Sequence, residues 1–322
     1  MKKIVTAVIL LFACSLNAVV SESILKNVLQ KNIELNLKAL DTFQKDVDSK
    51  NLPKIEDSFK EFIESWKKVE ASYIAGELDE SVIDSPRFID IFHNAKEDIK
   101  EQLKRILNSK EDLNIELFKN SYKSVNALEY MIFNDKKLTN RELKAIDIAI
   151  KHIKINLLDI KDVYFAKNEK FLKDEQFANA LIMNSLTDSS YKLKEWRVGD
   201  ALGVTKKYKD SPDNRRSEYY LSGLSVEAII AILETHSSLI DKQNFKNFGD
   251  MAESSGAKNE IVKAREYLNE SIKYAKSIKE NNLESKEALK LYKSLEKLHN
   301  SYYISLILAL KVTSKILDAD GD

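Results

Sequence analysis

Residues 121–134, SYKSVNALEYMIFN, contain an acid whose position calls for a chemical explanation. At about 100° per residue, the apolar side chains between Phe118 and Phe133 form one face of a helix, and Glu129 projects from the middle of that face. A carboxylate buried there must be protonated, hydrogen-bonded, paired with a cation or bound to a metal, because an unpaired buried charge is too costly to persist. Since its own helical face offers no Lys or Arg, Glu129 is predicted to have a partner elsewhere.

Asn126 and Glu129 are three residues apart, so both side chains fall on one surface of the expected helix. Asn is a poor zinc ligand and cannot act as a base, and the chain contains no His-Glu-x-x-His sequence. With a further carboxylate such as Asp90, the pair could hold iron, calcium or magnesium through oxygen. The alternative is structural: Glu129 pairs with an arginine of another helix or a loop, for instance Arg87, Arg197, Arg215 or Arg216.

His93 offers a second candidate metal ligand. Asp90 and His93 are spaced as neighbours on one helical turn, and a carboxylate that orients an imidazole is common next to metals. The same spacing is equally typical of a surface ion pair. The candidate metal ligands are therefore Glu129, Asp90 and His93, and the ordinary ion pair remains the alternative.

Arg215, Arg216 and Ser217 form the third candidate site. Two adjacent guanidinium groups could bind a carboxylate or phosphate through bidentate contacts, or could attach their loop to Glu129 or Asp200. The residues predicted to bind a ligand are Ser124, Asn126, Glu129, Asp200, Arg215, Arg216 and Ser217.

Composition and periodicity predict an all-α protein of two packed helical-bundle halves. The 322 residues are 43% apolar, enough for a large core, and seven Gly and three Pro favour long helices. The 51 basic and 51 acidic side chains balance, which gives no support for a nucleic-acid partner. Apolar spacing predicts helices over residues 24–50, 53–76, 85–108, 121–134, 139–165, 174–194, 225–239, 257–281 and 285–317, the last with a central, buried segment at 302–310.

The helical pattern is interrupted once, by a long structured loop at residues 196–223 that contains Gly199, Gly203, Pro212 and Gly223. Long loops in compact helical proteins are usually functional or mobile. The loop divides the chain into an N-terminal half, residues 22–195, and a C-terminal half, residues 196–322.

Residues 1–21 read as a signal peptide, because Lys2 and Lys3 precede an apolar run that is too short to span a membrane. Cys14, the one cysteine, follows Leu11-Phe12-Ala13 and is the alternative start of a lipid-anchored chain. Either reading places the mature protein in a bacterial periplasm, soluble or lipid-anchored, and no transmembrane span is expected in it.

Four segments, in this order and spacing, together resemble the imelysin-like family of exported bacterial proteins. They are Trp66 with Lys67-Lys68-Val69; Ser124-Val-Asn-Ala-Leu-Glu129, similar to a Gly-x-His-x-x-Glu motif; Gly199-Asp-Ala-Leu-Gly203 with Arg215-Arg216-Ser217 and Ser225; and the terminal Ala319-Asp-Gly-Asp322. The resemblance implies an all-helical fold of two halves with a site near their junction, a link to iron uptake, and a metallopeptidase label.

The departures from the motif bear on activity. Ser124 stands where the family has Gly, and Asn126 where it has His. If that histidine is required for chemistry, this chain cannot perform it, so no catalytic residue is predicted. The expected function is a binding or accessory component in iron uptake, with iron or another divalent cation as the candidate cofactor and iron-transport components of the cell envelope as partners. The alternatives are a metal-dependent peptidase of the imelysin type and a partner-binding helical scaffold.

Overall fold

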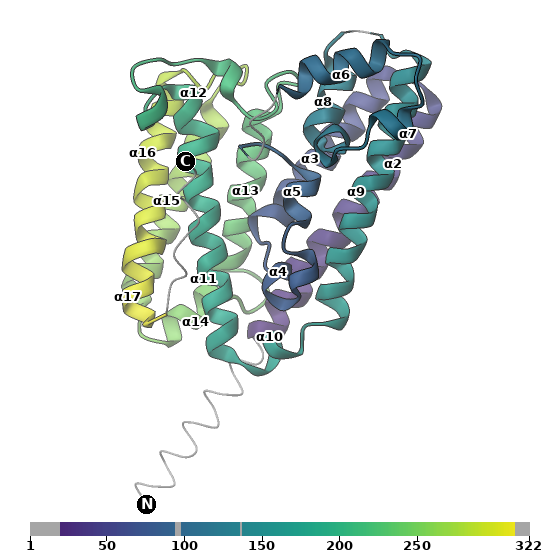
Figure 1. The fold of residues 1–322 in the computed structure, drawn as a ribbon. Coiled ribbons are helices and arrows are strands. Elements are labelled where there is room, and N and C mark those ends of the chain that lie inside the picture. Colours follow the sequence, from purple (N-terminus) through teal and green to yellow (C-terminus); the bar gives the residue numbers. More distant parts are fainter. Residues whose placement is uncertain (1–19, 94–97, 136, 313–322) are drawn as a thin grey trace, which may run out of the picture.

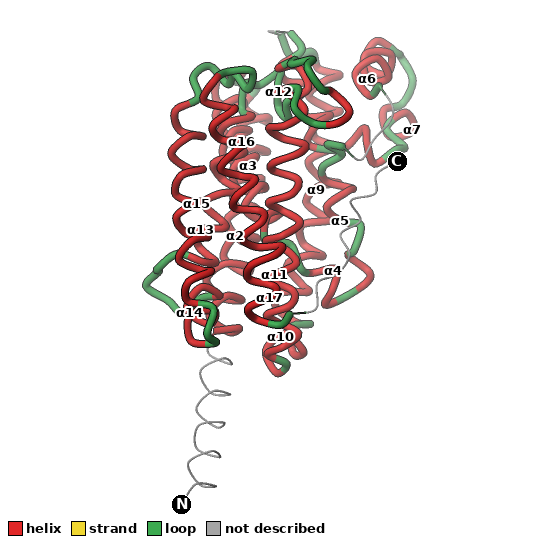
Figure 2. The backbone as a smooth tube through the Cα atoms, turned by 90° about the vertical axis from the view of Figure 1, so that its left-hand side faces the viewer, coloured by secondary structure: helices red, strands yellow, loops and turns green. Residues whose placement is uncertain are grey.

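The computed structural model describes residues 20–93, 98–135 and 137–312. Over these ranges all regular structure is helical and no strand occurs, as predicted (Figures 1 and 2). None of the helices in these ranges combines the length and the apolar character that crossing a membrane requires. Most of the expected leader, with Cys14, and the terminal segment 319–322 lie outside the described residues.

The N-terminal half is built on the hairpin of helices α2 and α3, with the long helix α9 packed against α2 (Figure 1). Helix α3 begins after Asn51, whose side chain caps it, and Pro53 occupies its first turn. The helices of this half are α2 Lys31–Ser49, which follows a π-helical segment Leu25–Gln30, α3 Leu52–Ala71, α4 Ala75–Leu78, α5 Ser85–Ile89, α6 Ile99–Asn108, α7 Leu113–Glu116, α8 Val125–Phe133 and α9 Asn140–Ala166.

The C-terminal half packs α13 and α16 against α15. Helix α11, which precedes the predicted boundary at residue 195, packs beside α16 and is described with this half; α13 and α11 contact α3 of the first half. Figure 1 shows the two halves side by side. The helices here are α10 Glu169–Lys173, α11 Glu175–Lys192, α12 Asp200–Leu202, α13 Ser225–Ile240, α14 Phe248–Ser254, α15 Lys258–Ser277, α16 Lys286–Asn300 and α17 Ile307–Leu310, with a π-helical segment Ser301–Leu306 between the last two.

The single helix predicted over residues 85–108 is wrong, because the chain leaves the helix at Asp90. Helix α5 ends at Ile89, Asp90 is extended, and His93 adopts a left-handed φ of 62°. Helix α6 starts anew after Asp98, whose carboxylate accepts hydrogen bonds from the first turn. This break carries Asp90 into the interior.

The long loop begins later than predicted. Helix α11 continues through a π-helical segment, Leu193–Gly199, into α12, which ends at Leu202 and is followed by Gly203. Gly203 has a φ of +73°, and a Cβ there would lie 2.5 Å from the backbone nitrogen of Pro212, so this turn requires glycine. The loop proper is residues 203–224, with short 3-10 turns at Lys206–Tyr208 and Asn214–Arg216.

Two burial predictions are also wrong. Residues 302–310 do not form a central helix, since Tyr303, Ile304 and Leu308 are 46%, 49% and 71% exposed and only one edge of the segment packs inward. Phe118 is 70% exposed, because the chain before Val125 forms a 3-10 turn, Asn120–Lys123, rather than the first turns of α8.

Candidate functional site: a buried charge cluster at the junction

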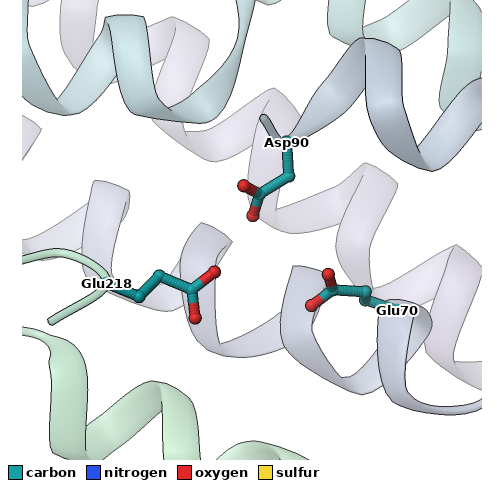
Figure 3. A group of neighbouring side chains, drawn as sticks. All are labelled: Glu70, Asp90 and Glu218. Atoms are coloured by element: carbon teal, nitrogen blue, oxygen red, sulfur yellow. The ribbon is translucent and has the colours of Figure 1, made fainter. Parts of the chain in front are cut away.

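A fully buried lysine, Lys67 of α3, occupies the centre of the junction. Its Nζ lies 2.6 Å from Asp90 Oδ2, 2.6 Å from Glu218 Oε1 and 2.8 Å from Glu70 Oε2. An ammonium group has three donors, so each carboxylate takes one. Figure 3 shows the three carboxylates converging from helix α3, from the segment after α5 and from the loop before α13.

Arg197, from the π-helical end of α11, is the second cation of the cluster. Its Nε donates to Glu218 Oε2 at 2.7 Å and its Nη2 to Glu70 Oε2 at 2.8 Å. Three carboxylates thus meet two buried cations, a denser arrangement than a single ion pair. Such a network tolerates burial because every charge has a partner and hydrogen bonds.

The acceptor positions of Asp90 are filled by four donors in all. Its Oδ2 accepts from Trp66 Nε1 at 3.1 Å and from the Tyr219 hydroxyl at 2.9 Å in addition to Lys67, and its Oδ1 accepts from the Phe92 backbone at 3.0 Å. Tyr219 has a left-handed φ of 59°, which is costly for a bulky residue and persists only where surrounding contacts enforce it.

Burial and charge act in opposite directions on the pKa values here. Burial would lower the pKa of Lys67, but Asp90, Glu218 and Glu70 outweigh it and raise that pKa above its ordinary value. Burial would likewise raise the pKa of Asp90, but the Lys67 charge and hydrogen bond lower it to about 2. Lys67 and Asp90 are therefore both charged at neutral pH.

The lowered pKa of Asp90 predicts acid sensitivity. A carboxyl with a depressed pKa in the folded state contributes stability above its unfolded pKa and loses it as pH falls through the folded value. We expect about 2 kcal/mol of the free energy of unfolding to disappear between roughly pH 4 and pH 2. Denaturant unfolding across this range, compared for wild type, Asp90→Asn and the exposed control Asp57→Asn, checks it. If the free energy of unfolding falls with decreasing pH as steeply in Asp90→Asn as in wild type, the assignment to Asp90 is contradicted.

Asn126 and Glu129 of the motif hold the segments that carry the cluster, and Ser124 caps their helix. Ser124 caps α8 by accepting from the Ala127 backbone at 3.3 Å. Asn126 Oδ1 accepts from the backbone N–H of Ile91 at 2.8 Å, directly after Asp90. Glu129 Oε1 accepts from both the backbone and the hydroxyl of Ser222, at 2.9 and 2.8 Å. Helix α8 thereby holds both the break after α5 and the loop before α13.

Glu129 has a partner outside its helix, as predicted, but this partner is Ser222 and not one of the arginines given as the structural alternative. Burial raises the pKa of Glu129, and the two Ser222 hydrogen bonds oppose that shift. The arginines proposed for it have other partners: Arg87 lies near Asp84, Arg197 binds Glu218 and Glu70, Arg215 binds Asp213, and Arg216 donates to carbonyl oxygens of Ser211 and Asp200.

His93 contacts Asp200 rather than Asp90. Its Nε2 lies 3.0 Å from Asp200 Oδ2, and its ring stacks on Trp196 with centroids 4.7 Å apart. Asp200 Oδ1 also accepts from the Thr205 hydroxyl at 2.7 Å. The predicted pairing with Asp90 presupposed a helix through residue 93, and that helix ends at Ile89.

The remaining candidates shape the loop. The guanidinium of Arg216 lies 4.1 Å from the Tyr208 ring centroid, and Ser217 Oγ donates to the carbonyl of Asn214 at 2.6 Å. Arg215 is paired with Asp213 at the surface. Whether Arg215, Arg216 or Ser217 also binds a ligand stays a prediction.

A resident metal does not fit the cluster. Among the described residues, Glu70, Asp90 and Glu218 are the one set of three ligand atoms within 4.8 Å of one another. Their facing oxygens are bonded to the Lys67 ammonium, so a cation would have to displace a buried positive charge. Within the described ranges, the predicted ligands Glu129, Asp90 and His93 do not bring three ligand atoms within 4.8 Å of one another.

Lys67, Glu70 and Glu218 are functional-site residues that the sequence analysis missed, and Arg197 was named there only as a possible partner of Glu129. Lys67 and Glu70 carried a usable signal, since they follow Ile63 and Trp66 by four residues and so fall on the apolar face of α3. Like Glu129, they are charged residues on an apolar helical face and need partners on other elements. Arg197 and Glu218 carried no comparable pattern.

These features define an all-α protein of two helical halves with a buried, charge-filled junction. The Imelysin family model matches residues 25–302, and the chain therefore belongs to the imelysin family. A search of curated proteins found no match.

Two solved structures share this fold. An imelysin-like protein from Psychrobacter arcticum is 14% identical with a TM-score of 0.75, and the match covers 92% of this chain and 95% of that one. A protein from Parabacteroides distasonis, described as a "putative iron-regulated protein A precursor", is 12% identical with a TM-score of 0.71 and the same coverage.

Proposed function

We propose that the protein is an exported, non-catalytic binding or accessory component of bacterial iron uptake. Membership of the imelysin family and the iron-regulated description of the Parabacteroides distasonis protein support the link to iron. The expected leader at residues 1–21 supports export to the periplasm, where iron-transport components of the envelope would be its partners.

The observation that carries the non-catalytic proposal is the Lys67 ammonium at the centre of the junction. A zinc peptidase needs several ligands, an open coordination position and a general base. Here the carboxylates are paired with Lys67 and Arg197, and the oxygen of Asn126 is bonded to backbone. Both features favour architecture and recognition over hydrolysis.

Solvent reaches the junction at two of its polar side chains. The side chains of Glu70 and His93 are 23% and 25% exposed, whereas those of Lys67, Asp90 and Glu218 are at most 2% exposed. His93 is held there by Asp200 and by stacking on Trp196. We place the recognition surface of the proposed function at these two part-exposed side chains, with the ring of Trp196 beside His93.

Restoring the family's histidine should not create a peptidase. Asn126→His replaces the acceptor of the Ile91 N–H, and we expect it to lower the free energy of unfolding by about 1–2 kcal/mol. Because Lys67 still occupies the carboxylates, we expect no zinc-dependent cleavage of a denatured protein substrate. If Asn126→His cleaves the substrate in the presence of zinc, and adding Glu129→Ala to it abolishes the cleavage, the alternative of a peptidase of the imelysin type is favoured.

The iron-uptake proposal is tested in the source bacterium. A deletion strain should grow more slowly than wild type under iron limitation and equally well with iron in excess. The wild-type gene should restore growth, and fractionation should find the protein in the periplasm or envelope. Equal growth of the deletion strain in both media would reject the role in iron uptake and favour a partner-binding scaffold.

A further inference from the structure

The outer face of helix α9 carries an unusual row of exposed apolar side chains. Ile155, Leu158 and Phe165 are 60%, 43% and 45% exposed, and Ile148 is half-buried on the same side. The rest of α9 packs into the N-terminal half against α2, α5 and α8. Contiguous apolar surface of this kind usually marks an interaction site.

The spacing of these residues is that of a coiled-coil seam. Ile148, Ile155, Leu158 and Phe165 follow each other at intervals of seven, three and seven residues, and Lys151 and Asp162 occupy the two remaining seam positions. We call these six residues the α9 stripe. Over residues 148–165 it is about 25 Å long.

The α9 stripe can pair with the same stripe of a second, antiparallel copy of the chain. If a second copy lies antiparallel, with the two-fold axis between residues 156 and 157, Ile155 faces Leu158 of the second copy and Ile148 faces its Phe165. The same register places Lys151 opposite Asp162 of the second copy. Apolar groups meet apolar groups and opposite charges meet, on both sides of the axis at once, as an isologous interface requires.

We propose that this chain forms a two-fold symmetric dimer through the α9 stripe. The present partner of Lys151 does not oppose this, because its contact with Asp147 at 2.6 Å is an exposed pair on one helix, worth about 0.3–0.5 kcal/mol. Lys154 and Lys161 flank the stripe, and in this register Lys154 would approach Lys161 of the second copy. Their charges are met by Asp41 at 2.7 Å and Glu34 at 3.9 Å, both on α2.

A hollow beside Ile148 extends the surface beyond α9. It has a volume of about 710 Å³ and lies between α7 and α9, with Leu113, Lys144 and Ile148 among its lining. In the antiparallel register, Phe165 of the second copy faces Ile148 at the edge of this hollow. A large ring entering a partly apolar hollow is a usual anchor of a protein interface.

Sedimentation equilibrium and light scattering of the purified protein test the proposal. Wild type should be dimeric at micromolar concentration. Lys151→Asp and Asp162→Lys should each weaken dimerisation at least about tenfold, because each places like charges opposite one another twice. The double variant Lys151→Asp, Asp162→Lys should restore the affinity, since the pairs return with their signs exchanged.

Leu308→Asp is the matched control, because Leu308 is an exposed apolar residue of α17 in the other half. It should leave dimerisation unchanged. A monomeric wild type would overturn the proposal and leave the stripe to a different partner. A dimer that tolerates both single charge reversals, or that Leu308→Asp disrupts, would equally overturn it by placing the interface elsewhere. Far-ultraviolet circular dichroism confirms that each variant is folded.

Discussion

Lys67→Met is expected to lower the free energy of unfolding by about 3–5 kcal/mol at pH 7. The substitution keeps the length of the side chain but leaves Asp90, Glu218 and Glu70 without the ammonium that bonds all three. Removing one member of a buried ionic network costs this much because three buried carboxylates are then left with one buried cation, Arg197. Urea unfolding followed by circular dichroism measures the loss.

Lys68→Met is the matched control, because Lys68 is the next residue on α3 and makes a part-exposed contact with Glu234 at 2.8 Å. It should cost no more than about 1 kcal/mol. A further signature separates electrostatics from packing: millimolar Ca²⁺ or Mn²⁺ should raise the melting temperature of Lys67→Met and leave wild type unchanged. Equal stability of Lys67→Met and wild type would contradict the central role of Lys67.

Glu129→Ala is expected to lower the free energy of unfolding by about 2–3 kcal/mol, since the backbone N–H and hydroxyl of Ser222 lose their shared acceptor. The loop at residues 203–224 should loosen with it. Hydrogen exchange measured by mass spectrometry should therefore show faster exchange in this loop, while α15 and α16 remain protected.

Glu129→Gln distinguishes architecture from charge. The amide oxygen of Gln can accept both Ser222 hydrogen bonds, and burial already raises the pKa of Glu129. A group with a raised pKa contributes stability below its unfolded pKa, here 4.5, and loses it as pH rises through the folded value. Relative to wild type, Glu129→Gln should therefore gain stability as pH rises from 4 towards 7. A variant as unstable as Glu129→Ala at pH 7 would show that the ionised carboxylate is needed.

The fold could be predicted from sequence because helical periodicity is a local signal. The apolar faces of α2, α3 and α9 follow from spacing alone, and so does the need of Glu129 for a partner. The identity of that partner did not follow. Ser222 is 93 residues away, and nothing in the spacing of either segment indicates that they meet.

The break at Asp90 could not be read from sequence either, because tertiary contacts override local propensity there. Residues 85–108 have a helical pattern, yet Trp66, Lys67 and Tyr219 together draw Asp90 out of the helix and into the interior. The consequence for the site is large. His93 contacts Asp200 instead of Asp90. The metal site was predicted from Asp90 and His93 lying on one helical turn, and the chain does not form that turn.

Lys67 was accessible to sequence reasoning and was overlooked. A lysine four residues after Ile63, on a face that also carries Phe59 and Phe62, is as misplaced as Glu129 on its own face. The local sequence pattern therefore indicated both a buried carboxylate, Glu129, and a buried ammonium group, Lys67. Arg197 and Glu218, in contrast, become cluster members only when the loop before α13 folds against α3.

The central claim is that the Lys67 ammonium occupies the junction and keeps metal out. The most direct test is the metal content of the purified protein, measured by elemental analysis after equilibration with Fe²⁺ or Mn²⁺ and removal of free metal. Wild type should retain no stoichiometric metal that depends on Glu218, whereas Lys67→Met should gain a bound cation that Glu218→Gln removes. One equivalent of metal in wild type, lost in Glu218→Gln, would contradict a junction closed by Lys67 and would return the site to metal chemistry.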